Sequence, residues 1–204
     1  MHDDNRCFLP WQGSAPSGFQ FGMQCHGRRS RQAWHHRMNL YIDTEFTSLS
    51  DPRLISIGAV TDDGRSFYGI VGDFPQSACT RFVREQVLPW LDLHAADASA
   101  SFEVLAWRFR DWLAEVSATS ARPCRLFVDD EADLEMLRQL LRKGGWMPVD
   151  IEAYCVLHPL SSANDALPAL ERWFNENPGR CRHNALDDAW AYRHAITSNG
   201  TSDA

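Results

Sequence analysis

The sequence predicts an α/β fold in which a mixed five-stranded sheet is flanked by helices on both faces. Three strand-like segments follow one another with short polar turns between them, which indicates an antiparallel meander. Segments with helical spacing then alternate with short apolar segments, which is typical of strands joined through helices. The chain has 204 residues, enough for one such domain and too few for two of ordinary size.

The three strands of the meander are expected between Leu40 and Val71. Leu40–Phe46 is a short apolar run that follows a polar region. Arg53–Val60 is apolar almost throughout, which predicts a strand buried on both faces. Asp62-Asp63-Gly64 is a turn sequence, and Arg65–Val71 follows it as the third strand.

Helices and strands are expected to alternate in the rest of the chain. The first helix rests on Phe82, Val83, Val87 and Leu88, which recur at helical spacing. In chain order we expect helices over 78–91 and 101–116, a strand over 124–128, a helix over 132–143, a strand over 149–156, and helices over 166–175 and 186–197. This order of elements fits an RNase H-like arrangement.

Residues 1–37 differ from the rest of the chain in composition. They mix Gly, Ser, Gln, Pro and aromatic residues without a period, and five Arg against two Asp give them a net charge of +3. We expect a disordered or non-native extension here, with Met38 as the true start. A single domain is then expected over 38–197, followed by a flexible tail over 198–204.

The composition argues against several classes of protein. Residues 38–204 carry fifteen Lys and Arg against twenty-five Asp and Glu, so a broad basic surface for nucleic acid is not expected. No apolar run has membrane-spanning length, and the N-terminus lacks the apolar core of a secretory signal. Six cysteines without a C-x-x-C pair predict reduced thiols and a cytoplasmic location.

Two acids, Asp43 and Glu45, end the first strand with one residue between them. On a strand this spacing places both carboxylates on the same face. Like charges side by side at the end of a buried strand repel each other and lose hydration. A cation between them removes that cost, so the pair predicts half of a divalent-metal site.

Asp133 is a candidate to join this pair. It follows the strand over 124–128 and precedes Met136 and Leu137, so we expect it in the first turn of a helix. In an α/β sheet that position lies near the strand ends where ligands bind. An acid in a first helical turn can also simply cap the helix, and the local sequence leaves both roles open.

The helix over 186–197 begins with two consecutive acids. A helical wheel places Asp188 near Ala191 and Ala195, small residues that allow a helix to approach a sheet closely. Asp187 lies beside His194 on the polar side. We therefore expect Asp188 to point inward and Asp187 to face water.

These residues resemble the motifs of the DEDDh family of 3'-5' exonucleases, the DnaQ-like or RNase T-like group. The first family motif, Asp-x-Glu at the end of an apolar strand, matches Asp43-Thr44-Glu45. The second, an Asp followed at +3 and +4 by apolar residues, matches Asp133. The third, a His five residues before an Asp, matches His183 and Asp188.

The resemblance covers residues 38–197 and is greatest for small bacterial 3'-5' exoribonucleases. It departs from the family pattern at the second motif, where Asp129-Asp130 replaces the usual His-Asn. Asp130 or Asp129 therefore remains an alternative to Asp133 as the acid of that motif.

The resemblance implies hydrolysis of phosphodiester bonds from a 3' end with two Mg²⁺ or Mn²⁺ ions about 4 Å apart. It implies that His183 acts as general base on the attacking water. The implied metal ligands, which are also catalytic residues, are Asp43, Glu45, Asp133 and Asp188, with Asp43 bridging the ions.

The implied partner is single-stranded or 3'-overhang nucleic acid, with RNA favoured over DNA. Phe46 could stack on the terminal base or belong to the core, and Arg180 and Arg182 could meet phosphates or water. The alternatives are a DNA exonuclease with the same site and a catalytically silent nucleic-acid-binding domain. The family also suggests a homodimer. A zinc site is a remote alternative, with ligands Cys124, Cys155, Cys181 and His183.

Overall fold

The computed structural model describes residues 38–93, 98–118, 124–128, 130–145, 151–156 and 166–199. The predictions for residues 1–37, for Asp129 and for residues 200–204 lie outside this part of the chain. Within it, no helix is both long enough and apolar enough to cross a membrane.

The sheet is mixed, and its strand order is β4-β3-β2-β1-β5-β6. Strand β2 pairs antiparallel with both β1 and β3, whereas β5 runs parallel to β1 and to β6. The five predicted strands are confirmed, and a two-residue strand, β4, extends the edge beside β3. The strands are β1 (Asn39–Phe46), β2 (Leu54–Thr61), β3 (Ser66–Val71), β4 (Ser99–Ala100), β5 (Cys124–Val128) and β6 (Ile151–Val156).

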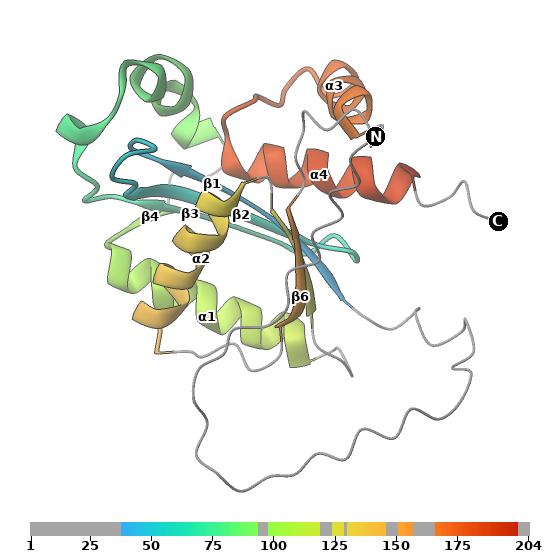
Figure 1. Ribbon diagram of the computed structural model, residues 1–204, viewed down its shortest axis with the longest axis horizontal. Coiled ribbons are helices and arrows are strands. Elements are labelled where there is room, and N and C mark those ends of the chain that lie inside the picture. Colours follow the sequence, from blue (N-terminus) through green and yellow to red (C-terminus); the bar gives the residue numbers. More distant parts are fainter. Residues whose placement is uncertain are drawn as a thin grey trace, which may run out of the picture. The chain divides into compact units, whose positions relative to one another are not determined.

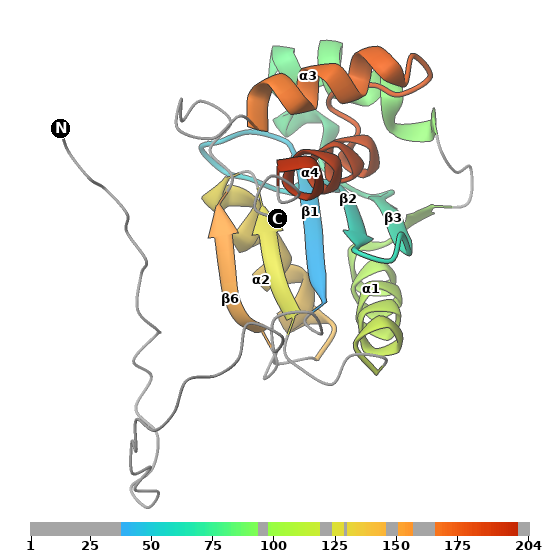
Figure 2. The same cartoon turned by 90° about the vertical axis from the view of Figure 1, so that its right-hand side faces the viewer.

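Helices cover both faces of the sheet, as predicted (Figures 1 and 2). Helices α1 and α2 pack against each other and against one face, on β3 and β1. Helix α4 lies on the other face, across β1 and β2, with α3 packed against it. The helices are α1 (Phe102–Ala118), α2 (Glu131–Lys143), α3 (Ala166–Glu176) and α4 (Ala185–Asn199), so α4 includes the start of the predicted tail.

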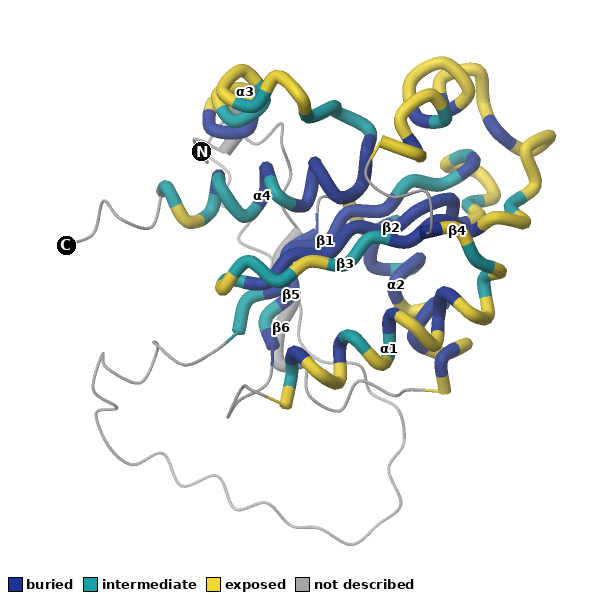
Figure 3. Tube along the Cα trace, turned by 180° about the vertical axis from the view of Figure 1, so that it is seen from behind, coloured by how far each residue is buried: buried dark blue, intermediate teal, exposed yellow. Residues whose placement is uncertain are grey.

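Strand β1 shows how the alternation of side chains separates core from site. Leu40 and Ile42 point toward α1 and α2 and belong to the largest buried apolar cluster. Tyr41 points to the other face and packs with residues of α3 and α4. Asp43 and Glu45 continue that second face. Every residue of the neighbouring strand β2 is buried, as predicted, and Figure 3 shows the buried centre of the sheet.

The predicted helix over 78–91 is wrong in kind. The segment contains a π turn over Val83–Val87 and a 3₁₀ helix over Leu88–Leu93. Pro89 has no N–H to donate within a continuous α-helix, which accounts for the change of helix type. The side chain of Phe82, which helical spacing assigned to the apolar face, is 53% exposed.

Candidate metal centre and nucleotide site

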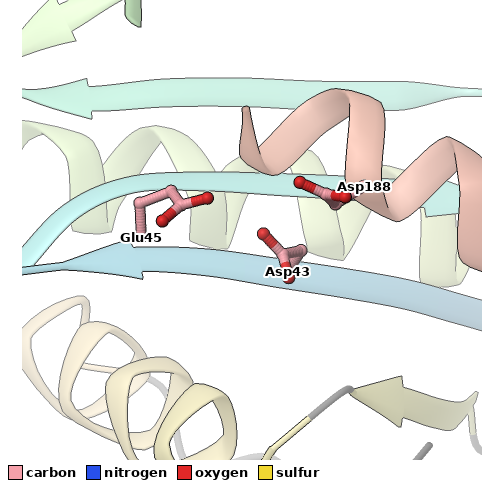
Figure 4. A group of neighbouring side chains, drawn as sticks. All are labelled: Asp43, Glu45 and Asp188. Carbon is pink, nitrogen blue, oxygen red and sulfur yellow. The ribbon is translucent and has the colours of Figure 1, made fainter. Parts of the chain in front are cut away.

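Three carboxylates meet where the end of β1 faces the first turn of α4 (Figure 4). Each of Asp43, Glu45 and Asp188 offers one oxygen, and these three oxygens lie within 4.8 Å of one another. Asp43 and Asp188 are buried, and Glu45 is half-buried at the edge of the group. The three residues are named the carboxylate cluster below.

A glycine in β2 allows α4 to come this close to the sheet. Gly58 lies directly opposite Asp43 in the register of β1 and β2. A Cβ atom at Gly58 would lie 2.2 Å from the carbonyl oxygen of Ala185 and 2.4 Å from the nitrogen of Leu186. The start of α4 therefore rests on bare backbone of β2, and this contact brings Asp188 next to Asp43.

Two hydrogen bonds orient the buried acids of the cluster. The hydroxyl of Tyr192 donates to Oδ1 of Asp43 over 3.1 Å. Tyr192 and Asp188 are four residues apart on α4, so both side chains leave the same face of the helix. The backbone N–H of His183 donates to Oδ2 of Asp188 over 2.8 Å. Tyr192 was missed by the sequence analysis, since an aromatic residue at this spacing is indistinguishable from ordinary core.

The electrostatics of the cluster are unfavourable without a cation. Removal from water, and then the charges of Asp188 and Asp133, hold the pKa of Glu45 well above its ordinary value. An acid with a raised pKa in the folded state favours folding least when it is ionised. Neutral pH therefore imposes on the folded protein a repulsion that a bound cation would relieve.

The donors of the cluster fit a hard divalent cation. All three ligand atoms are carboxylate oxygens, which Mg²⁺ and Mn²⁺ prefer. Among the described side chains, no group of His, Cys, Asp and Glu other than this one is arranged to hold an ion. Cys124 and Cys181 do not belong to it, and the side chain of Cys155 lies outside the described residues.

Asp133 approaches β1 from the opposite face of the sheet and is not part of the carboxylate cluster. Its Oδ1 accepts hydrogen bonds from the hydroxyl and the backbone N–H of Thr44, the latter over 3.1 Å. Its Oδ2 accepts the backbone N–H of Asp130 over 2.9 Å. Asp133 thus closes the capping box of α2 and ties it to the residue between Asp43 and Glu45. A direct metal bond from Asp133 stays a prediction.

Asp130 caps helix α2, which is the second role that the sequence left open for an acid in this region. It is the N-cap residue of α2, and its side chain accepts the backbone N–H of Ala132 over 2.8 Å. Asp130 is exposed and does not belong to the carboxylate cluster. Its capping role is sufficient to explain an acid at this position.

His183 stands beside the cluster in an unusual backbone conformation. Its φ angle is 63°, in the left-handed region that residues other than glycine seldom occupy. Its ring meets the ring of Phe82 edge to face, with centroids 5.0 Å apart. Burial, and then the charge of Arg182, lower the pKa of the imidazole below 6.5. The neutral form that can accept a proton is therefore favoured at neutral pH.

The expectation that Asp187 faces water is wrong. Its side chain is fully buried, and its Oδ1 accepts a hydrogen bond from the guanidinium of Arg180 over 2.8 Å. Arg180 is therefore paired with an acid. Arg182 is paired with Glu171 over 2.7 Å and lies over the ring of Phe174. Both arginines have protein partners, which the sequence did not reveal.

A hollow of about 510 Å³ lies beside the carboxylate cluster. Glu45 is shared by the two. Phe46 lines the hollow and also packs, partly buried, against the core; its stacking on a base stays a prediction. Leu49, which also lines the hollow, is 81% exposed. Phe82 lines the hollow too, although its helical spacing predicted a place in the core. The lining residues are Glu45, Phe46, Ser48, Leu49, Ser50, Thr80, Phe82 and Val83.

Replacing Glu45 with glutamine is expected to stabilise the metal-free protein. Because the folded-state pKa of Glu45 is raised, the wild-type protein loses stability as the pH rises above the unfolded-state pKa and through the folded-state one. In EDTA at pH 7 we expect Glu45→Gln to have a Tm roughly 2–4 °C above that of the wild type. We expect added Mn²⁺ to raise the Tm of the wild type but not that of Glu45→Gln.

Thermal unfolding followed by circular dichroism at pH 5 and pH 7 measures both effects. The control is Glu115→Gln, which removes an exposed acid from α1 and should change neither value. A Glu45→Gln protein that is less stable than wild type in EDTA would show that the charges do not repel as described.

The sequence has no match among protein-family models or among curated proteins. Solved structures are similar in fold. A zinc-bound complex of E. coli exonuclease I with single-stranded DNA superposes with a TM-score of 0.56 at 16% identity, over 82% of this chain and 41% of that one. A second E. coli exonuclease I structure, with a dT13 oligonucleotide, gives a TM-score of 0.54 at 15% identity, over 83% and 42%.

Exonuclease I from Methylocaldum szegediense gives a TM-score of 0.50 at 13% identity, over 81% of this chain and 41% of that chain. The chain thus spans about two fifths of the length of the exonuclease I structures that it matches. At such low identity the similarity concerns the fold. The protein therefore has an α/β fold of the RNase H-like type found in exonuclease I.

Proposed function

We propose that this protein is a metal-dependent 3'-5' exonuclease that acts on single-stranded nucleic acid, with RNA as its preferred polymer. The observation that carries the proposal is the meeting of Asp43, Glu45 and Asp188 at one point, with His183 hydrogen-bonded to Asp188. Acids from two ends of the domain that converge repel each other, and a bound cation would relieve that repulsion. The similarity in fold to exonuclease I agrees with the proposal.

Each residue near the cluster has a role in the proposed reaction. Asp43, Glu45 and Asp188 would hold Mg²⁺ or Mn²⁺, and the hydroxyl of Tyr192 keeps the Asp43 carboxylate in position. Bound divalent ions would neutralise charge on the scissile phosphate and lower the pKa of the attacking water. The neutral imidazole of His183 would accept the proton of that water.

In this proposal Asp133 supports the site from the opposite face of the sheet. Its bonds to Thr44 fix the backbone between the two acids of β1, at a point beyond Tyr41, the last residue that β5 pairs in the described sheet. The proposal also includes a direct contact between Asp133 and an ion. Loss of Asp133 would then disturb the directions of Asp43 and Glu45 together.

The hollow is where we place the terminal nucleotide. Phe46 and Phe82 offer aromatic surfaces on which a base can stack, and Leu49 offers an exposed apolar contact. Stacking tolerates any base, which suits an enzyme that removes nucleotides one after another. The hollow reaches Glu45, so the phosphate of a nucleotide bound there would lie near the carboxylate cluster.

Phe82→Ala is expected to raise KM about tenfold with little change in kcat, since stacking on one base contributes about 1–3 kcal/mol. Steady-state kinetics on a short labelled oligonucleotide measure both constants. Trp107→Ala is the matched control, because Trp107 is 48% exposed on α1, on the other face of the sheet. Equal effects of the two substitutions on KM would contradict the placement of the terminal nucleotide in the hollow.

The choice between RNA and DNA rests on two different observations. The resemblance of the motifs to small exoribonucleases favours RNA. Two of the solved structures that share the fold are complexes of exonuclease I with single-stranded DNA or a dT13 oligonucleotide, which favours DNA as the second candidate. The homodimer that the resemblance implies and the cytoplasmic location that the cysteines predict are part of the same proposal. Sedimentation velocity measures whether the protein is a dimer.

The test of the function is digestion of 5'-labelled RNA and DNA, each single-stranded and with a 3' overhang, in Mn²⁺ and in EDTA. We expect a ladder shortening from the 3' end in Mn²⁺, faster on RNA, and none in EDTA. Faster laddering on DNA would select the second candidate. Binding of these substrates without any hydrolysis would instead show a catalytically silent domain.

A further inference from the structure

We propose that Asp187 is a positioning residue that holds the segment carrying His183 against the start of α4. The inference rests on the proposed role of His183 as general base. Asp187 is the neighbour of a candidate metal ligand, yet its carboxylate is turned toward the preceding loop. Its Oδ1 accepts the Arg180 guanidinium over 2.8 Å, and its Oδ2 accepts the backbone N–H of Cys181 over 2.9 Å.

The two consecutive acids act on the same short segment. Asp187 fixes Arg180 and Cys181, while Asp188 accepts the backbone N–H of His183 over 2.8 Å. Consecutive helical residues point in directions about 100° apart, so the two carboxylates can hold different parts of one loop. Arg180–His183 is thereby attached at three points to the first turn of α4.

Such attachment matters because His183 has a φ of 63°. A residue with a Cβ atom leaves the left-handed region unless its surroundings hold it there. Asn184 continues the attachment on the other side, since its buried side chain donates to the backbone oxygen of Trp90 over 2.9 Å and accepts from the N–H of Leu186. The backbone of His183 is thus held by hydrogen bonds on both sides of it.

The charge on Asp187 is also accounted for. A fourth carboxylate beside Asp43, Glu45 and Asp188 would increase the repulsion in the cluster. The guanidinium of Arg180 lies against Asp187 and neutralises it, so the acid holds the loop without adding net charge. These contacts distinguish Asp187, a support for His183, from Asp188, a candidate metal ligand.

The test separates positioning from metal binding. In Asp187→Asn, which keeps an acceptor for the Cys181 N–H but loses the charge pair, we expect kcat to fall about tenfold; in Asp187→Ala we expect about a hundredfold. KM should stay within about twofold and the Kd for Mn²⁺ within about threefold, because the carboxylate cluster is intact. Asp111→Asn removes an exposed acid paired with Arg110 on α1 and should leave every value unchanged.

Hydrogen exchange supplies a measurement that needs no activity. We expect the amides of Cys181 and His183 to exchange about tenfold faster in Asp187→Asn and in Arg180→Gln than in wild type, while amides of β1 keep their rates. Arg180→Gln keeps Asp187 and removes the guanidinium that pairs with it. This variant therefore replaces the Asp187 variants in the experiment if they fail to fold.

Three results would overturn the inference: unchanged amide exchange, an unchanged kcat, or a fall in Mn²⁺ affinity that matches the fall in kcat. The last would make Asp187 a metal ligand. If the wild-type protein hydrolyses no substrate, the proposed function fails separately. The exchange rates then still decide whether Asp187 holds the loop.

Discussion

Asp43→Asn and Asp188→Asn are expected to reduce kcat/KM about a thousandfold or more, because each removes a charge from the centre of the carboxylate cluster. Bound divalent ions contribute several kcal/mol of transition-state stabilisation, and each 1.36 kcal/mol corresponds to a factor of ten in rate. Asparagine keeps the size of the side chain. The hydrogen bond to Tyr192 or to His183 can still be accepted by the amide oxygen, so the fold should persist.

Single-turnover digestion of labelled RNA in Mn²⁺ measures the loss. The control is Asp111→Asn, an exposed acid on α1 that should retain full activity. Comparison of Asp187→Asn with Asp188→Asn is the most informative pair, because the residues are adjacent and only Asp188 belongs to the cluster. An Asp188→Asn enzyme with more than a tenth of wild-type activity would contradict the proposed role of the cluster.

Gly58→Ala is expected to damage both the fold and the site. The new Cβ would lie 2.2 Å from the Ala185 oxygen and 2.3 Å from its carbonyl carbon, and backbone atoms cannot move aside as a flexible side chain can. Overpacking of this kind costs about 3 kcal/mol, or roughly 6–12 °C in Tm for a domain of this size. Because the start of α4 must move away, Asp188 separates from Asp43 and Mn²⁺ binding is lost.

Thermal unfolding and Mn²⁺ titration of the same sample measure these two effects. Gly179→Ala is the matched control, since no atom of the described residues lies within 4 Å of its added Cβ and its backbone is not left-handed. A Gly58→Ala protein with wild-type Tm and metal affinity would show that the close approach of α4 to β2 does not position the site.

Local periodicity was sufficient to predict much of the fold and part of the site. Alternation along β1 places Asp43 and Glu45 on one face whatever the rest of the chain does. Small residues on one side of α4 identify the face that can approach the sheet, and Asp188 lies there. These features depend on one element each, so the sequence of that element contains them.

The remaining features depend on contacts between distant segments. Asp187 is buried because the loop before α4 returns over it with Arg180, and helical position alone places it in water. Asp133 is turned toward Thr44 and Asp130 by a capping box whose second partner lies on β1. Phe82 lines the hollow together with Phe46 of β1, a residue far from it in the sequence. Periodicity within a single segment contains none of this information.

Calorimetric titration of Mn²⁺ into protein freed of metal by EDTA tests the central claim most directly. We predict saturable binding by the wild type, by Asp187→Asn and by Asp111→Asn, and loss of that binding in Asp43→Asn and Asp188→Asn. No binding by the wild type, or equal binding by all five proteins, would contradict the assignment of Asp43, Glu45 and Asp188 as a metal centre.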